Sequence, residues 1–288
     1  MLVAHKYSII KRIGGGEFGQ VFAGKNERTG EIVAIKMESS SANQIRLLKH
    51  ESTILNFLYS KLCRNIPPVY WFGTYGDTHI AMVLPYYTDE PLSSRSGSIE
   101  PIQFLKSAIQ ILREIHKNGV VHRDIKPANW MFRTGKTGEK EMILIDFGLA
   151  TFLGTESVHE ETKVHSNIIG TPKFASWFVH CGREYEKRDD LLSALYLAMW
   201  IHHGDQMWDS IVELESGDEE DDGIEIQLEP DYDKAKTHVD HPMNSWLKRA
   251  KSKANVARLC REMGDDRICR IADTLYSDDI KYSYRIFS

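Results

Sequence analysis

The hydrophobic pattern of this chain changes about 85 residues from its start, and that change limits the folds it can adopt. Before it, short apolar segments are separated by glycines and turn residues, as in strands joined by hairpins. One helical segment interrupts them, in which Ile45, Leu48, Ile54 and Leu58 recur close to a 3.6-residue period, with residues 39–41 as candidate caps. The expected strands cover residues 7–12, 20–24, 32–37, 69–73 and 79–84, with a hairpin turn at 26–30.

The rest of the chain is mainly helical. Ser98 is a candidate N-cap for a helix with Pro101 in its first turn and Gly119 after its end. Residues 191–201 are apolar nearly all round, which predicts a helix that is buried on every side. We therefore predict an α+β fold with a small sheet-rich part and a larger helical part. Short strands are also expected around residues 120–121, 130–132 and 142–145.

The composition is that of a globular protein. With 288 residues, 42% of them hydrophobic, the chain can bury one large core or two modest ones. The net charge of −5 gives no support to a general nucleic-acid binder, and no apolar run approaches the roughly 20 residues of a membrane helix. No long apolar stretch follows Met1, so a secretory signal is not expected. The four cysteines form no CxxC pair, so a zinc site is not expected either. We expect reduced thiols in an intracellular protein, cytoplasmic, nuclear or both.

A glycine-rich run, GGGEFGQV, lies between the first two expected strands. Its Gly14, Gly16 and Gly19 let backbone amides come close to phosphate oxygens, which a side chain would prevent. The same spacing marks dinucleotide-binding folds, but a helix follows directly in those folds. Here a strand that contains Val21 and a hairpin follow instead, which disfavours a nucleotide-binding dehydrogenase.

A lysine, Lys36, stands near the end of the third expected strand in the run VAIK. An ammonium group at that place can reach the α- and β-phosphates of a nucleotide, and it needs a carboxylate to hold it. Glu51 shares a helical stripe with Leu48, Ile54 and Leu58, so we expect it to face inward. Taken alone, each of the two would be an exposed charge on a strand or a helix.

The most specific signal is the run HRDIKPAN, which ends at Asn129, followed by DFG, which begins at Asp146 after an apolar strand. In this pattern Asp124 orients an attacking hydroxyl and accepts its proton, while Lys126 neutralises charge on a transferring phosphoryl group. Asn129 and Asp146 supply the hard oxygen ligands that Mg²⁺ prefers. The glycine-rich run, VAIK, Glu51, HRDIKPAN and DFG are five elements in the expected order, which argues against a chance match.

Over nearly its whole length the sequence resembles the eukaryotic protein kinase superfamily. Lys126, two residues after Asp124, is typical of its serine/threonine kinases. The run GTPKFAS at residues 170–176 stands where most kinases carry Ala-Pro-Glu, and it is similar to the casein kinase 1 group. The runs RDDL at 188–191 and LYSDD at 275–279 are similar to that group too. Its tau-tubulin kinase branch is a near alternative.

The resemblance implies a two-lobed kinase domain that transfers the γ-phosphoryl group of ATP, with Mg²⁺, to serine or threonine hydroxyls of protein substrates. Asp124, Lys126 and Asn129 would be catalytic, and Asp190 would bind the backbone of the catalytic loop. A monomer is expected, with no nucleic-acid or membrane partner. The implied limits, within 1–288, are 1–84 for the β-rich N-lobe, 85–91 for the hinge and 92–288 for the helical C-lobe. The implied metal ligands are Asn129 and Asp146, and the implied ATP-binding residues are Ile13, Gly14, Gly16, Gly19, Val21, Ala34, Lys36, Glu51, Leu84, Pro85, Tyr87 and Asp146.

Within that set, Leu84 would guard the back of the adenine pocket. The family uses the carbonyl of the residue at Pro85 and the amide of the residue at Tyr87. Proline has no N–H but keeps its C=O, so Pro85 is compatible with this role.

The acceptor side departs from the family. Lys173 stands where the family has an arginine, and Arg183 and Lys187 are further candidates for a substrate-anion site, although each is equally compatible with a solvated surface charge. An acidic run at 213–225 stands near the place of a basic loop that helps the family to bind acidic or pre-phosphorylated substrates. Preference for such substrates is therefore left open. The chain also stops soon after its YSY run, so the family's last helix is expected to be short or missing.

Two functions from different classes fit these observations. The first is an active, non-specific serine/threonine protein kinase. The second is a pseudokinase or scaffold that binds nucleotide with little turnover. The presence of every expected phosphoryl-transfer residue argues against the second.

Overall fold

The protein is described here from a computed structural model, which describes residues 2–16, 19–39, 45–87, 91–92, 99–135, 138–154, 167–205, 207–208, 239 and 241–277. The chain divides into two compact units. The first contains Met1–Leu92 and Ala128–Thr151, and the second contains Ser93–Pro127 and Phe152–Ser288. The lobe limits expected from the sequence stay a prediction. The acidic run at 213–225 lies outside the described residues.

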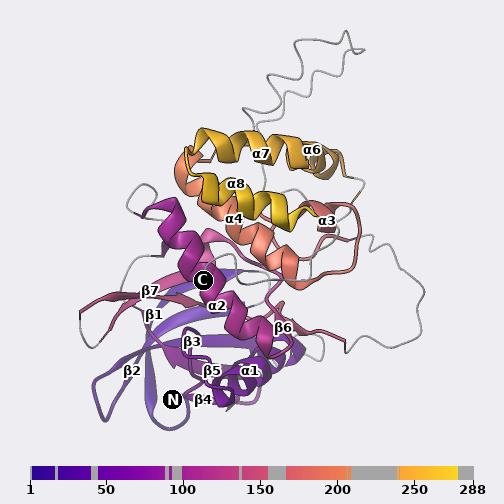
Figure 1. The fold of residues 1–288 in the computed structure, drawn as a ribbon. Helices are drawn as coiled ribbons and strands as arrows, with labels where there is room; N and C mark the ends of the chain where they lie inside the picture. Colours follow the sequence, from indigo (N-terminus) through magenta and orange to yellow (C-terminus); the bar gives the residue numbers. More distant parts are fainter. Residues whose placement is uncertain are drawn as a thin grey trace. The chain divides into compact units, whose positions relative to one another are not determined.

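A five-stranded antiparallel sheet forms most of the first unit (Figure 1). All five expected strands are present, mostly longer than predicted, but the fourth begins at Trp71 and not at residue 69. Their spatial order is β1-β2-β3-β5-β4. The strands are β1 (Tyr7–Gly16), β2 (Gly19–Asn26), β3 (Ile32–Ser39), β4 (Trp71–Tyr75) and β5 (His79–Pro85).

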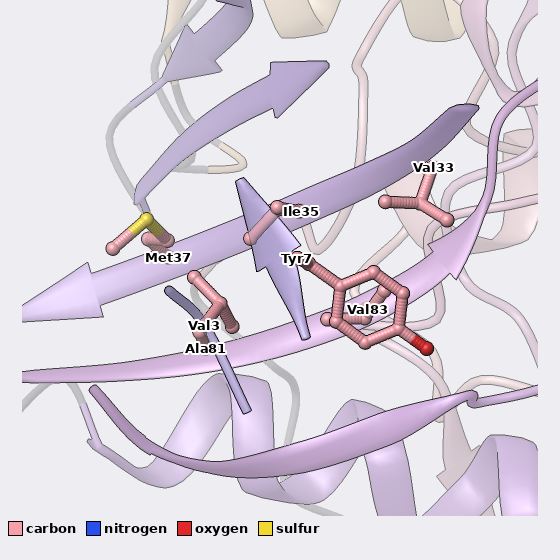
Figure 2. Packing of buried hydrophobic residues seen from close by; sticks show 7 residues of the cluster. All are labelled: Val3, Tyr7, Val33, Ile35, Met37, Ala81 and Val83. Carbon is pink, nitrogen blue, oxygen red and sulfur yellow. The ribbon is translucent and has the colours of Figure 1, made fainter. Parts of the chain in front are cut away.

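One face of this sheet is a compact apolar cluster. Val33, Ile35 and Met37 alternate along β3 toward this face, because side chains of a strand point to opposite sides in turn. Figure 2 shows them packed with side chains from β5 and from the start of the chain. These partners are Val3, Tyr7, Ala81 and Val83.

Helix α1 (Ile45–Ser60) packs against β3 and β5. Leu48, Ile54 and Leu58 are buried, as the periodicity predicted, and Glu51 is buried beside them. Of the candidate caps at 39–41, Ser39 ends β3 and the other two lie outside the described residues.

The first unit also contains the hairpin of β7 (Trp130–Thr134) and β8 (Lys140–Leu144). Its pairing begins with Trp130 opposite Leu144. Asn65, after α1, holds β8: its backbone carbonyl accepts from the Leu144 N–H at 2.9 Å, and its side-chain amide donates to the Met142 carbonyl at 2.9 Å. The short 3₁₀ turn η2 (Pro127–Asn129) precedes β7 directly.

The second unit is built from helices (Figure 1). The expected helix with Pro101 in its first turn is present, but its N-cap is Glu100, so the prediction of Ser98 as the cap was wrong. Helix α4 is buried along residues 189–201, which confirms the prediction of a helix buried on every side. The helices are α2 (Pro101–Lys117), α3 (Trp177–His180), α4 (Lys187–His203), α6 (Pro242–Ala250), α7 (Lys253–Glu262) and α8 (Asp266–Leu275). Two short strands, β6 (Val120–Val121) and β9 (Thr151–Phe152), complete the described elements.

Helix packing explains the buried positions of the second unit. Helix α4 packs against α2 and α8, and α8 packs against α7. Ser252 and Asp265 cap α7 and α8 by accepting hydrogen bonds from the Asn255 and Arg267 amides, respectively. Among the described residues, no helix has the length and apolarity to cross a membrane.

Truncation of Ile35 tests the apolar cluster on the outer face of the sheet. Ile35 is fully buried, so Ile35→Ala leaves a cavity and is expected to lower the free energy of unfolding by about 2–5 kcal/mol. Ile10→Ala is the matched control, because Ile10 lies on β1 and is 53% exposed. Urea denaturation of both variants measures the difference, and equal losses would contradict the assigned packing.

Candidate active site

Strand pairing places five of the expected ATP-binding residues on one face of the sheet. Gly14 lies opposite Val21, and Val21 lies opposite Lys36. Ala34 lies opposite Leu84. Residues i and i+2 of a strand share a face, and directly paired residues share it too. These five positions therefore face away from the apolar cluster of Figure 2.

Three other expected members, Ile13, Pro85 and Tyr87, lie at or just beyond the ends or irregularities of strands. Ile13 is 40% exposed and falls where the β1–β2 register shifts. Pro85 ends β5, and Tyr87 follows two residues later. The Tyr87 hydroxyl is buried and has no hydrogen-bond partner within the part of the chain that the structure describes, and burial raises its pKa. Contacts of these residues with adenine stay a prediction.

Glycine is required at the turn of the glycine-rich hairpin. Gly16 pairs with Gly19, and residues 17–18 between them lie outside the described residues. Gly19 has φ +143°, and a Cβ there would lie 2.7 Å from the Met37 carbonyl oxygen. A side chain would therefore strain the backbone and clash with β3. Among the described residues, a Cβ at Gly14 would meet the Val21 Cβ alone, at an ordinary contact distance of 3.8 Å.

Lys36 joins two carboxylates. Its ammonium lies 2.7 Å from Glu51 Oε1 and 2.9 Å from Asp146 Oδ1, so the expected partnership with Glu51 is confirmed. Glu51 Oε1 also accepts from the Phe147 amide at 3.3 Å. Burial by itself would lower the pKa of Lys36, but the two carboxylates outweigh it and raise that pKa above its usual range. The lysine therefore stays charged.

The hairpin of β7 and β8 brings the two expected metal ligands to one end. The Ile145 amide donates to the Asn129 carbonyl at 2.9 Å, one step beyond the pair of Trp130 with Leu144. Asn129 and Asp146 therefore lie close together where the hairpin leaves the ladder. Asp146 has φ +68°, an uncommon backbone conformation for a residue with a side chain, and its side chain is 43% exposed. The donor set of carboxylate and amide oxygens fits Mg²⁺.

Two side chains in the second unit, one from the loop of Asp124 itself and one from a distant segment, hold Asp124 from both sides. Its Oδ2 lies 2.7 Å from the Lys126 ammonium, and its Oδ1 accepts a hydrogen bond of 2.7 Å from the Thr171 hydroxyl. Asp124 is 6% exposed. The Thr171 contact joins residues 47 positions apart, and no sequence pattern identified it. Only the place of Thr171 inside the run GTPKFAS could have suggested it.

Asp190 binds the backbone of this loop, as expected. Its carboxylate accepts from the His122 amide at 2.8 Å and from the Arg123 amide at 3.0 Å. The His116 ring and the Tyr185 hydroxyl contact the same carboxylate, each at 2.8 Å. Burial would raise the pKa of Asp190, but these hydrogen bonds and the nearby histidines lower it, so the carboxylate stays ionised.

Arg123 is held in an unfavourable conformation between two groups. Its φ of +67° is uncommon for a residue with a side chain and costs on the order of 1–3 kcal/mol. Asp190 fixes its amide, and Gly170 lies against its carbonyl. A Cβ at Gly170 would lie 2.2 Å from the Arg123 carbonyl oxygen, so glycine is required there.

A buried lysine, Lys251, supports the segment that carries Thr171. Its ammonium donates to the carbonyls of Pro172 at 2.6 Å and Ala175 at 2.7 Å, and it lies 3.0 Å from His180 Nε2. Burial and Lys251 lower the pKa of His180, which favours a neutral ring, and its Nε2 also lies 3.2 Å from the Pro172 carbonyl oxygen. No motif in the sequence identifies Lys251 as buried, because a lysine in an amphipathic helical region is usually exposed.

Aromatic rings complete the surroundings of Lys251. Its ammonium lies 5.4 Å from the Tyr196 ring centre and 5.6 Å from that of Trp208. Burial lowers the pKa of Lys251, while carbonyl oxygens and ring faces are the groups that stabilise an ammonium in such a place.

The three candidates for a substrate-anion site have different surroundings. Lys173 forms an ion pair of 2.8 Å with Asp205. Arg183 is exposed and lies over the Phe178 ring, 5.1 Å from its centre. Lys187 begins α4. Their role in anion binding stays a prediction.

Replacement of Lys251 tests its support of the Thr171 segment. Lys251→Met keeps the length of the side chain but removes the donor to two buried carbonyls, so the free energy of unfolding is expected to fall by about 2–4 kcal/mol. Lys253→Met, at a site whose side chain is 56% exposed, is expected to change it by less than about 0.5 kcal/mol. Urea denaturation measures both, and a loss below about 1 kcal/mol for Lys251→Met would contradict this role.

The sequence was also compared with models of known protein families. The model described as the protein kinase domain matches residues 7–268, which spans the sheet and the helices described above as far as the start of α8. A match over so much of the chain shows the family and agrees with the α+β architecture. This chain belongs to the eukaryotic protein kinase family.

Proposed function

We propose that this chain is an active serine/threonine protein kinase of the casein kinase 1 type, which transfers the γ-phosphoryl group of ATP to protein hydroxyls. The observation that carries the proposal is Asp124, whose two carboxylate oxygens contact Lys126 and Thr171. An acceptor hydroxyl needs a carboxylate that is fixed in place, and these two contacts fix the carboxylate of Asp124.

The first unit supports the nucleotide side of this proposal. Lys36 is charged and is held by Glu51, and this lysine–glutamate ion pair is one that a protein kinase needs in place. From there its ammonium can bind the α- and β-phosphates. Asn129 and Asp146 would hold Mg²⁺, which supplies positive charge to the phosphate oxygens when it is bound.

The second unit supports the acceptor side. Asp124 accepts the proton of the serine or threonine hydroxyl as its oxygen forms a bond to the γ-phosphorus and the bond from that phosphorus to ADP breaks. Each carboxylate oxygen has more than one lone pair, so Asp124 can accept from the substrate while Thr171 and Lys126 stay bound. Lys126 stabilises the negative charge that is transferred.

The segment after Thr171 supports the casein kinase 1 type. Ser176 ends the run that stands where most kinases carry Ala-Pro-Glu, and its hydroxyl donates to the buried Asp189. It also caps α3 by accepting from the Val179 amide at 3.2 Å. A serine can therefore stabilise this segment from within, without the glutamate.

On the resemblance to protein kinases we also propose the limits of the lobes: 1–84 for the N-lobe, 85–91 for the hinge and 92–288 for the C-lobe.

Removal of the proposed base tests the acceptor side. Asp124→Asn keeps the shape of the side chain but removes the acceptor for the proton, so kcat is expected to fall by roughly 10²–10⁴-fold. Initial rates on a peptide library measure the change, with Asp266→Asn on α8 as a control of equal charge change. A loss below tenfold would contradict the proposed role of Asp124.

Removal of the proposed metal ligand separates an active kinase from a pseudokinase. Asp146→Asn is expected to abolish Mg²⁺-dependent autophosphorylation, because it removes a carboxylate that Mg²⁺ prefers to a neutral amide. Phosphate incorporation over a series of Mg²⁺ concentrations measures this. A wild-type protein that binds ATP but turns over neither casein nor any library peptide would support the pseudokinase instead.

A further inference from the structure

Lys173 lies beside the proposed acceptor site. It follows Thr171 by two residues, and Thr171 hydrogen-bonds to Asp124. Two residues span at most about 7 Å, so side chains that flank an acceptor hydroxyl at Asp124 come within reach of Lys173. The backbone here is fixed, because the Trp208 indole N–H donates to the Lys173 carbonyl at 3.2 Å.

The ammonium of Lys173 is already engaged by a carboxylate of the same chain. Lys173 Nζ lies 2.8 Å from Asp205 Oδ1. The Trp200 indole N–H donates to the same oxygen, also at 2.8 Å, so the carboxylate is held by two donors. The side chain of Lys173 is 12% exposed, whereas that of Asp205 is 79% exposed. The pair therefore presents its carboxylate, and not its ammonium, to solvent.

The position of Asp205 after the end of α4 explains why its carboxylate needs the contact with Lys173. Helix α4 ends at His203, and Gly204 turns the chain with φ +81°. A carboxylate just past a helix C-terminus meets the negative end of the helix dipole, which is unfavourable. The hydrogen bonds from Lys173 and Trp200 offset that repulsion and lower the pKa of Asp205.

A substrate anion would meet two obstacles at this point. It would have to displace Asp205 from Lys173, and its own negative charge would then lie within a few ångströms of the Asp205 carboxylate. Like charges at such a distance repel, and placing them together is a common means of rejecting an unwanted partner. An uncharged or basic side chain meets neither obstacle.

We propose that Asp205 is a specificity-determining residue of this kinase: by occupying the ammonium of Lys173 beside the acceptor site, it excludes acidic and phosphorylated side chains of the substrate from that ammonium. This inference rests on the proposed function. We therefore expect the kinase to prefer substrates that carry an uncharged or basic residue at the position which contacts Lys173.

Substitution of Asp205 tests the proposal directly. Wild-type protein and Asp205→Asn are compared on a peptide library in which each position around the acceptor serine is set in turn to alanine, glutamate, phosphoserine or lysine. At one position, Asp205→Asn is expected to raise kcat/KM for glutamate or phosphoserine relative to alanine by about fivefold or more, the scale of a charge-assisted contact with a partly buried ammonium.

Two further variants make the result specific. Asp273→Asn changes the net charge equally at another exposed site, on α8, and is expected to leave the preference unchanged. In Asp205→Asn combined with Lys173→Ala, the gain is expected to disappear, because no ammonium is left to bind the anion. A gain that persists in this double variant, or one that also occurs in Asp273→Asn, would overturn the proposal.

A binding measurement separates failure of this inference from failure of the proposed function. Fluorescence anisotropy of a labelled phosphoserine peptide from the same library requires no turnover, and Asp205→Asn is expected to bind it about fivefold more tightly than the wild type does. If no variant phosphorylates any peptide but this difference in binding is found, the proposed activity fails and the role of Asp205 stands. If neutral peptides are phosphorylated while Asp205→Asn changes neither preference nor binding, the role of Asp205 alone is refuted.

Discussion

The conformation of the loop that carries Asp124 depends on hydrogen bonds to the buried carboxylate of Asp190. This carboxylate accepts hydrogen bonds from two consecutive loop amides and contacts His116 and Tyr185. Placing an ionised carboxylate in the interior is unfavourable unless its oxygens are satisfied, and four donors satisfy them here. The hydrogen bond from the Arg123 amide to Asp190 also stabilises Arg123 in its uncommon backbone conformation, directly before Asp124. The proposed base is thus positioned by backbone hydrogen bonds and is not left to the flexibility of a loop.

The same principle positions the partner of that base. Thr171 lies between Gly170, which permits close approach to the Arg123 carbonyl, and Pro172, whose carbonyl accepts from Lys251. Lys251 is fully buried, so loss of its contacts would leave polar backbone groups without a donor. Each charged group that supports the acceptor side is therefore matched by groups of opposite polarity.

Much of the site could be predicted because its signals are local in the sequence. The strands, the glycine-rich hairpin and the catalytic run follow from periodicity and from residue types at fixed spacing. The partnership of Lys36 with Glu51 and the role of Asp190 also followed, the first from a helical stripe and the second from family resemblance. The N-cap of α2 was assigned wrongly to Ser98, because Ser98 and Glu100 both lie close before Pro101 and sequence preference favours serine.

By itself, the sequence determined the order of the elements, the residue types expected for phosphoryl transfer and the inward-facing stripe of the helix that carries Glu51, since strand alternation and helical periodicity are local properties of the chain. Only the tertiary structure decided which distant side chains meet. The contacts of Thr171 with Asp124, of Lys251 with the Thr171 segment and of Asp205 with Lys173 join residues 32 to 79 positions apart. Such contacts depend on how helices pack, and packing brings together residues whose separation in the sequence follows no period.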